Sequence, residues 1–242
     1  MAEERLDRLM SRLGYGSRRD VGYWIRLGLI EVAGKAAKSA NQKVDADDVL
    51  LEGKPLDHPH GLTVIYHKPL GRVCSRKEDG NLVYKDFPER WLGRKPPFNS
   101  VGRLDKETAG LLIFTDDGQL NHKLTSPKHA ISKTYAVTLA RPVTDDAVLR
   151  LASGTLMLED DVKPCLPAEL TIIDAHHVQL VLHEGRYHQV RRIFAALGNH
   201  VEALTRTHIA RLSLLETNLE AGQWQDLTAD ALWQRLLHPS SV

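Results

Sequence analysis

The sequence has 242 residues, of which 42% are hydrophobic, enough for one large domain or for a small domain followed by a medium one. Its formal net charge of +1 does not by itself indicate a nucleic-acid partner, although residues 58–150 carry 15 basic and 10 acidic side chains. Two cysteines exclude a disulfide framework, no apolar run is long enough to span a membrane, and the 12 histidines form no His-Glu-x-x-His pattern. We therefore expect a cytoplasmic protein without a metal site.

The first segment of the chain is expected to contain two short helices. Apolar residues recur at helical spacing over residues 4–13, which predicts an amphipathic helix. Ser17, with Asp20 three residues later, has the spacing of a capping box and predicts the start of a second helix. Gly28 provides the stop for that helix.

A hairpin over residues 29–37 and one short strand over residues 49–56 are expected to complete an N-terminal domain of residues 1–57. Residues 58–61 contain proline, glycine and histidine without periodicity, which predicts a linker. A second domain is expected over residues 62–238.

In the second domain, strands and helices are mixed without strict alternation. Strands are predicted at residues 62–67, 72–75, 110–118, 133–140, 166–174 and 176–184, with only short strands after residue 199. Helices are predicted after residue 118, from a cap at Thr144 to Gly154, up to Gly198, and near residues 228–237. This order favours an α+β fold over a doubly wound α/β fold.

The two N-terminal helices carry several arginines on the side that should face solvent. The segment RLDRLMSRLGYGSRRD, followed by IRLGLIEVAGK, resembles the S4 RNA-binding module. This resemblance implies that Arg5, Arg18, Arg19 and Arg26 contact RNA phosphates, to which arginine offers bidentate hydrogen bonds. The alternative is that these side chains only keep the surface soluble.

A single aspartate, Asp105, lies in the stretch SVGRLDKETAGLLIFTDDG, just before a strongly apolar run. A lone aspartate in a turn is most often a structural cap. The surrounding GRLDKETAGLL, however, resembles the signature of the RsuA/RluA group of pseudouridine synthases. The segments HKPLGRVCS, TDDGQLNHKLTSPKH, KTYAVTL and EGRYHQVRRIFAALGNHV follow in the order and spacing of that family. With the S4-like module, the resemblance extends over nearly the whole chain and is strongest to the RsuA family.

The resemblance implies a fold, an activity and a partner. The fold is a catalytic domain with a mixed, mainly antiparallel sheet flanked by helices. The activity is isomerisation of one uridine in small-subunit (16S) ribosomal RNA (rRNA), by a monomeric enzyme that needs no cofactor and acts on a pre-ribosomal particle. Two alternatives remain open: the same chemistry on large-subunit rRNA, and a non-catalytic ribosome-assembly factor that only binds RNA.

The resemblance also implies roles for individual residues. Asp105 is the catalytic carboxylate, which attacks C1′ of the nucleotide or takes the C2′ proton, and Arg191 forms a salt bridge with it. Tyr135 stacks on the extruded uracil, and Arg103 inserts where the base has left the RNA. Arg192 points about 100° away from Arg191 on a helix and is expected to contact an RNA phosphate instead.

Overall fold

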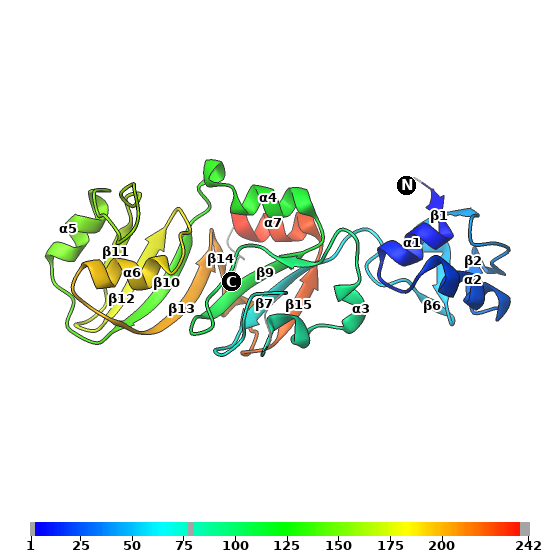
Figure 1. The fold of residues 1–242 in the computed structure, drawn as a ribbon, viewed down its shortest axis with the longest axis horizontal. Coiled ribbons are helices and arrows are strands. Elements are labelled where there is room, and N and C mark those ends of the chain that lie inside the picture. The colour runs from blue at the N-terminus through cyan, green and yellow to red at the C-terminus, as the bar shows by residue number, and fades with distance from the viewer. Residues whose placement is uncertain (1–2, 77–79, 238–242) are drawn as a thin grey trace.

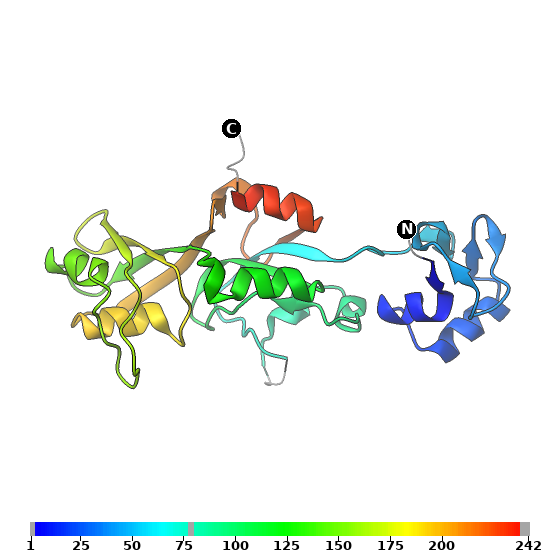
Figure 2. The same cartoon turned by 90° about the horizontal axis from the view of Figure 1, so that it is seen from above.

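The computed structural model describes residues 3–76 and 80–237, which form an elongated molecule. The N-terminal elements form a separate body at one end, and a long sheet with its helices occupies the rest of the length (Figures 1 and 2).

The N-terminal module contains two helices beside a small sheet. Its elements are β1 (Glu4–Arg5), α1 (Leu6–Arg12), α2 (Arg18–Arg26), β2 (Ile30–Val32), β3 (Lys35–Ala36), β4 (Lys43–Val44), β5 (Val49–Leu51) and β6 (Lys54–Pro55). The sheet order is β3-β2-β5-β6, and β1 pairs separately with β4.

Most local predictions for this module are confirmed. The Ser17 side chain accepts a hydrogen bond from the Asp20 backbone, and the Asp20 side chain accepts one in return, so the capping box is complete. The predicted single strand over residues 49–56 is wrong, because the chain reverses at Glu52 and Gly53, whose φ angles are 51° and 73°. The first helix is also shorter than predicted, since residues 4 and 5 pair as a strand.

The module packs closely against the short helix α3 (Glu89–Leu92) of the second domain. The Arg90 guanidinium lies 4.6 Å from the Tyr15 ring centre, and the Lys95 backbone donates a 2.8 Å hydrogen bond to the Arg12 carbonyl. A β carbon at Gly14 would lie only 2.3 Å from the Arg90 carbonyl oxygen, so this approach requires glycine. The domain limits at 57 and 62 stay a prediction, and the predicted limit at 238 lies outside the described residues.

The second domain is built on one long sheet in the order β11-β12-β10-β13-β9-β7-β15. Its strands are β7 (Thr63–Lys68), β9 (Ala109–Thr115), β10 (Lys133–Leu139), β11 (Glu169–Ile172), β12 (His177–Leu182), β13 (Val201–Ile209) and β15 (Trp224–Leu227), with β8 (Asn99–Ser100) and β14 (Leu212–Ser213) at its margin. Every neighbouring pair is antiparallel except β13 with β9. The predicted mixed, mainly antiparallel sheet is therefore confirmed.

Helices cover the sheet in two groups. The helices α4 (Gly118–Thr125) and α7 (Ala229–Leu237) share one apolar cluster with β7 and β9, and they lie side by side in Figures 1 and 2. At the other end, α5 (Asp146–Ala152) and α6 (Gln189–Ala196) pack on β10, β12 and β13. An aromatic cluster that includes Phe87, Trp91, Phe98 and Phe114 fills the face opposite α4. The two ends of the sheet thus have separate cores.

Three predictions for this domain are wrong. Residues 72–75 do not continue a strand, since only an isolated bridge joins Val73 to Leu82. Thr144 does not cap α5, because the N-cap position is Asp145 and no side chain caps the helix. The region expected to hold only short strands contains the nine-residue strand β13, which joins the two ends of the sheet.

Candidate active site

A cavity of about 790 Å³ opens where β13 meets β9, at the junction between the two ends of the sheet. Its lining includes six charged or aromatic residues that are described below: Arg103, Asp105, Tyr135, His188, Arg191 and Arg206. Four of the residues predicted to form the site are therefore brought together, although they come from three separate segments. Arg192 is not among the lining residues.

Asp105 lies in the loop between β8 and β9, at the mouth of the cavity. The Thr108 backbone donates a 3.1 Å hydrogen bond to the Asp105 carbonyl and closes this loop into a turn. The Asp105 side chain is 32% exposed, and its Oδ1 lies 3.4 Å from Nε2 of His188. The carboxylate is therefore accessible to a ligand that enters the cavity.

The buried side chain of Lys68 supports this loop from below. Lys68 is fully buried, and its Nζ donates hydrogen bonds to the carbonyls of Thr108 at 2.8 Å and Pro69 at 3.1 Å. Burial lowers the pKa of Lys68, while the nearby carboxylates of Asp105 and Glu107 act in the opposite direction. Our sequence interpretation missed this role, although the Lys-Pro pair in the turn after β7 was visible.

Arg191 holds the same loop, but it does so through backbone atoms. Its guanidinium donates 2.9 Å hydrogen bonds to the carbonyls of Glu107 and Val201. The predicted salt bridge with Asp105 is not formed: both residues lie in the described part of the chain, and no nitrogen of Arg191 comes within 4.0 Å of that carboxylate. Because its donors are committed to two carbonyls, Arg191 positions the loop, and His188 is the group that faces Asp105.

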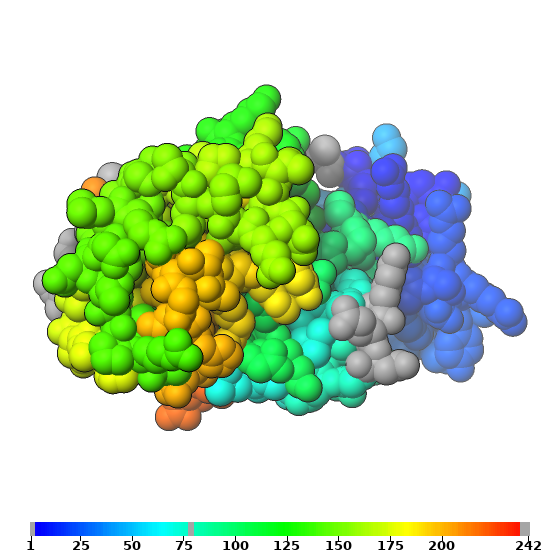
Figure 3. Space-filling view, turned by 60° about the vertical axis from the view of Figure 1, so that its left-hand side comes forward, coloured from blue at the N-terminus to red at the C-terminus, as the bar shows by residue number. Residues whose placement is uncertain are grey.

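His188 occupies an unusual position immediately before α6. Its φ of 48° is left-handed, and its ring stacks on Tyr187 with centres 3.9 Å apart and planes 15° apart. In Figure 3, α6 (orange) and the segment that precedes it (yellow) lie at the surface of this end of the molecule. Sequence reasoning did not single out His188, although it stands in the quoted EGRYHQVRR segment.

Tyr135 and Arg206 face each other across the pairing of β10 with β13. The Tyr135 ring is half-buried and packs against the apolar clusters at both ends of the sheet. Arg206 is 4% exposed, and its Nε donates a 2.7 Å hydrogen bond to the Leu111 carbonyl. Its Nη2 finds no hydrogen-bond partner among the described residues. Sequence reasoning missed Arg206 as well.

Two further predicted RNA contacts differ in their surroundings. Arg103 is exposed at the cavity mouth, and within the described part of the chain its side chain has no hydrogen bond or ion pair. Arg192 is partly buried and forms a 2.8 Å ion pair with Asp161. Arg103 is therefore free to meet a ligand, whereas Arg192 is held by an acidic partner.

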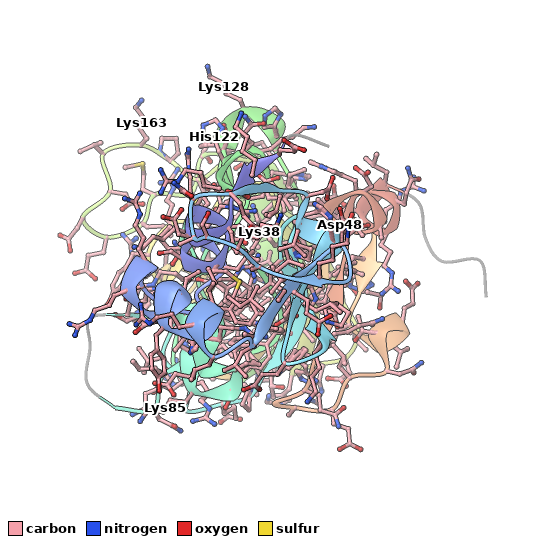
Figure 4. The ribbon with its side chains drawn as sticks, turned by 90° about the vertical axis from the view of Figure 1, so that its right-hand side faces the viewer. Lys38, Asp48, Lys85, His122, Lys128 and Lys163 are labelled. Carbon is pink, nitrogen blue, oxygen red and sulfur yellow. The ribbon has the colours of Figure 1, made fainter. Side chains whose placement is uncertain are left out.

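The predicted RNA-binding arginines of the N-terminal module lie at one end of the molecule, away from the β13–β9 junction where the cavity opens (Figure 1). Arg5, Arg18, Arg19 and Arg26 are exposed, and Arg5 forms a 2.8 Å ion pair with the buried Asp7. Figure 4 looks onto this end, where Lys38 also lies. Among the described residues, no group of three or more His, Cys, Asp or Glu side chains could hold a metal ion. No helix in the described ranges is long and apolar enough to cross a bilayer.

Comparison with known proteins identifies both parts of the chain. Residues 62–196 match the RNA pseudouridylate synthase family, and residues 4–50 match the S4 domain. Ribosomal small subunit pseudouridine synthase A of Pasteurella multocida is 38% identical over 232 residues, which cover 94% of this chain and 97% of the relative. The protein of the same name from Escherichia coli K12 is 38% identical over 233 residues, covering 94% and 98%. A crystal structure of a pseudouridylate synthase superposes with a TM-score of 0.67 at 36% identity, covering 96% of this chain and 99% of that one. The chain therefore belongs to the RNA pseudouridylate synthase family and carries an N-terminal S4 domain.

Proposed function

We propose that this pseudouridine synthase converts one uridine of small-subunit (16S) rRNA into pseudouridine, and that Asp105 is its catalytic carboxylate. The target is supported by the names of its relatives, which are 38% identical over 94% of the chain. The observation that supports Asp105 is the cavity at the β13–β9 junction, where an accessible carboxylate, a half-buried tyrosine and an anchored arginine converge.

The reaction explains why a carboxylate is needed there. Pseudouridine formation breaks the C1′–N1 bond, turns the uracil and joins its C5 to C1′. As the bond breaks, its electron pair leaves with the uracil and positive charge develops at the sugar, as in glycoside hydrolysis. Asp105 stabilises that charge either by attacking C1′ or by taking the C2′ proton. When C5 of the turned uracil bonds to C1′, it displaces the Asp105 oxygen on the first route, and Asp105 returns the proton to C2′ on the second. The uracil then loses its C5 proton and gains a proton at N1.

The other residues have roles that fit the same reaction. Tyr135 supplies a ring for the uracil to stack on, and its hydroxyl is a group to which the C5 proton can pass. Arg191 holds the Glu107 carbonyl and so fixes the loop that carries Asp105. Extruding a base costs a few kcal/mol, and the free guanidinium of Arg103 offsets part of this cost by filling the stack.

Tritium release tests both the target and the carboxylate. Separate transcripts of small-subunit and large-subunit rRNA carry 5-³H-uridine, and the enzyme releases tritium when C5 is joined to C1′. We expect release from the small-subunit transcript by the wild-type chain. Asp105→Asn should release none, because the amide cannot act as nucleophile or base, while its RNA affinity stays within a few-fold. Release from the large-subunit transcript alone would refute the target, and turnover by Asp105→Asn would refute the carboxylate.

The S4 domain is proposed to bind rRNA through its exposed arginines. Each phosphate contact releases counterions, so removing contacts should weaken binding and flatten its dependence on salt. We expect Arg18→Ala combined with Arg19→Ala to do both, measured as affinity for the small-subunit transcript at two salt concentrations. Arg150→Ala, on the exposed face of α5 at the opposite end, is the matched control. An unchanged salt slope in the double variant would mean that the arginines only solvate the surface.

We also propose that the enzyme acts before the small subunit is fully assembled. Protein covers much of the RNA in a finished subunit, so a partly assembled particle in the cytoplasm is the expected substrate. Comparing tritium release from naked transcript, from assembly intermediates and from mature subunits tests this point.

A further inference from the structure

Tyr187 is an exposed aromatic residue at the mouth of the catalytic cavity. Its side chain is 76% exposed, more than any other phenylalanine, tryptophan or tyrosine in the described ranges. An aromatic ring left in water contributes little to folding, because its stabilising effect comes from burial. The exposure of Tyr187 beside the cavity therefore indicates that the ring contacts a bound ligand.

The ring is held in a fixed orientation rather than left to rotate in solvent. It stacks on the His188 ring with centres 3.9 Å apart and planes 15° apart. His188 is itself fixed from the other side, since its Nε2 lies 3.4 Å from Asp105 and its backbone adopts φ of 48°. A non-glycine residue in this left-handed region costs on the order of 1 kcal/mol or more, and such strain concentrates at functional sites.

The backbone that carries Tyr187 is anchored by its neighbour. The Arg186 guanidinium donates hydrogen bonds to the Asp161 carboxylate at 2.8 Å, to the Lys163 carbonyl at 2.8 Å and to the Glu184 carboxylate at 3.0 Å. These contacts join the segment before α6 to the loop that follows α5. The two stacked rings thus form a flat surface beside Asp105, on a segment that Arg186 ties to the loop after α5.

We propose that the stacked pair Tyr187–His188 is a platform on which a nucleobase next to the target uridine stacks. This inference rests on the assignment of the cavity as the uridine site. Proteins read single-stranded RNA by splaying its bases onto aromatic rings, and every base has a face that can stack. The target uracil belongs deeper, on the half-buried Tyr135, so the outer ring is left for a flanking base. Arg103, exposed at the same mouth, keeps its proposed role of filling the stack that the target uracil has left.

Stacking predicts a specific order among substitutions of Tyr187. We expect Tyr187→Phe and Tyr187→Trp to bind rRNA within about twofold of the parent, because both keep a flat ring. Tyr187→Ala and Tyr187→Leu should weaken binding by roughly 5- to 100-fold, the range measured when a stacking ring is removed. Leu149→Ala, which alters a side chain that is 75% exposed on α5, is the control and should bind normally.

Affinities are measured for the full chain carrying Asp105→Asn, with transcripts of small-subunit and of large-subunit rRNA, so that binding is read without turnover. Because both transcripts are tested, the affinity of the Tyr187 variants is measured on the one that contains the target uridine, even if that uridine lies in large-subunit rRNA. Single-turnover rates with saturating RNA are measured in the active chain and should change less than about threefold, since the substituted ring of Tyr187 stacks on His188 and, within the described residues, forms no hydrogen bond with Asp105. Normal affinity in Tyr187→Ala would overturn the inference. So would normal affinity in Tyr187→Leu, which shows apolar contact without stacking, or a large loss of saturated rate with unchanged affinity.

Discussion

Replacing Lys68 by methionine tests whether a buried ammonium group holds the loop that carries Asp105 in place. The substitution keeps the length and apolar stem of the side chain but removes the donor to the Thr108 and Pro69 carbonyls. A hydrogen bond that involves a charged group contributes about 1.5–3 kcal/mol, and two such bonds are lost. The burial that lowers the pKa of Lys68 shows that the ammonium is also costly to keep inside, and this cost disappears in the variant.

The two effects oppose each other, so we expect a net loss of about 2 kcal/mol rather than the full value of both bonds. For a chain of this size, that loss lowers the melting temperature by roughly 4–8 °C. The effect on catalysis should be larger, because displacing the Asp105 loop by about 1 Å can cost on the order of 100-fold in rate.

Thermal unfolding followed by circular dichroism and single-turnover tritium release measure the two effects separately. The control is Lys85→Met, since Lys85 is exposed and points away from the protein (Figure 4). A Lys68→Met chain with wild-type rate and wild-type melting temperature would refute the role of the ammonium. A chain that loses stability but keeps its full rate would show that Lys68 supports the fold and not the loop.

Three further substitutions test separate features. Arg191→Ala should lower the single-turnover rate far more than Arg192→Ala, because Arg191 and not Arg192 donates a hydrogen bond to the Glu107 carbonyl. Arg191→Lys should keep partial activity. A larger loss of rate in Arg192→Ala than in Arg191→Ala would contradict the role of Arg191. Gly110→Ala should destabilise the protein by at least about 2 kcal/mol in urea unfolding, since the φ of Gly110 is 113° and a β carbon there would lie 2.3 Å from the Arg206 carbonyl oxygen of β13. Unchanged stability would contradict the close approach of β9 to β13. Burial alone would raise the pKa of Asp57, but hydrogen bonds from neighbouring side chains outweigh it and hold that pKa below 3.8. This contribution to stability is present above pH 3.8 and is lost at lower pH, so urea unfolding at pH 5 and pH 3 should show a larger loss for wild type than for Asp57→Asn.

Features that depend on a few neighbouring residues could be predicted from the sequence. The capping box at Ser17 needs only four consecutive residues, and it formed as expected. The strand β13 could not be found in this way, because the pairing of β10 with β13 shifts register at two places and breaks the alternation of buried and exposed residues. The buried Arg206 within it also looks like a surface residue when only the sequence is considered.

The candidate site also combines features that the sequence predicts with contacts that it does not. Resemblance to a family led to the proposal of Asp105, Tyr135 and Arg191, whereas the residues alone favoured a structural cap for Asp105. The partners of these side chains depend on contacts between distant segments. Lys68 reaches a carbonyl 40 residues away, and Arg191 reaches one 84 residues away. Sequence spacing does not determine which of several nearby cations or carbonyls such a side chain finally contacts.

The placement of β13 has a consequence for the synthesis of the protein. Its nine residues are synthesised after Asp105, Tyr135 and Arg191, yet they join the end of the sheet that carries Asp105 to the end that carries Tyr135. Pairing between β9 and β13 connects residues about one hundred positions apart, and such long-range pairing forms late because the intervening loop must first be closed. A nascent chain that stops before Val201 has no strand to connect the two ends, so the candidate site can be completed only after β13 has been synthesised.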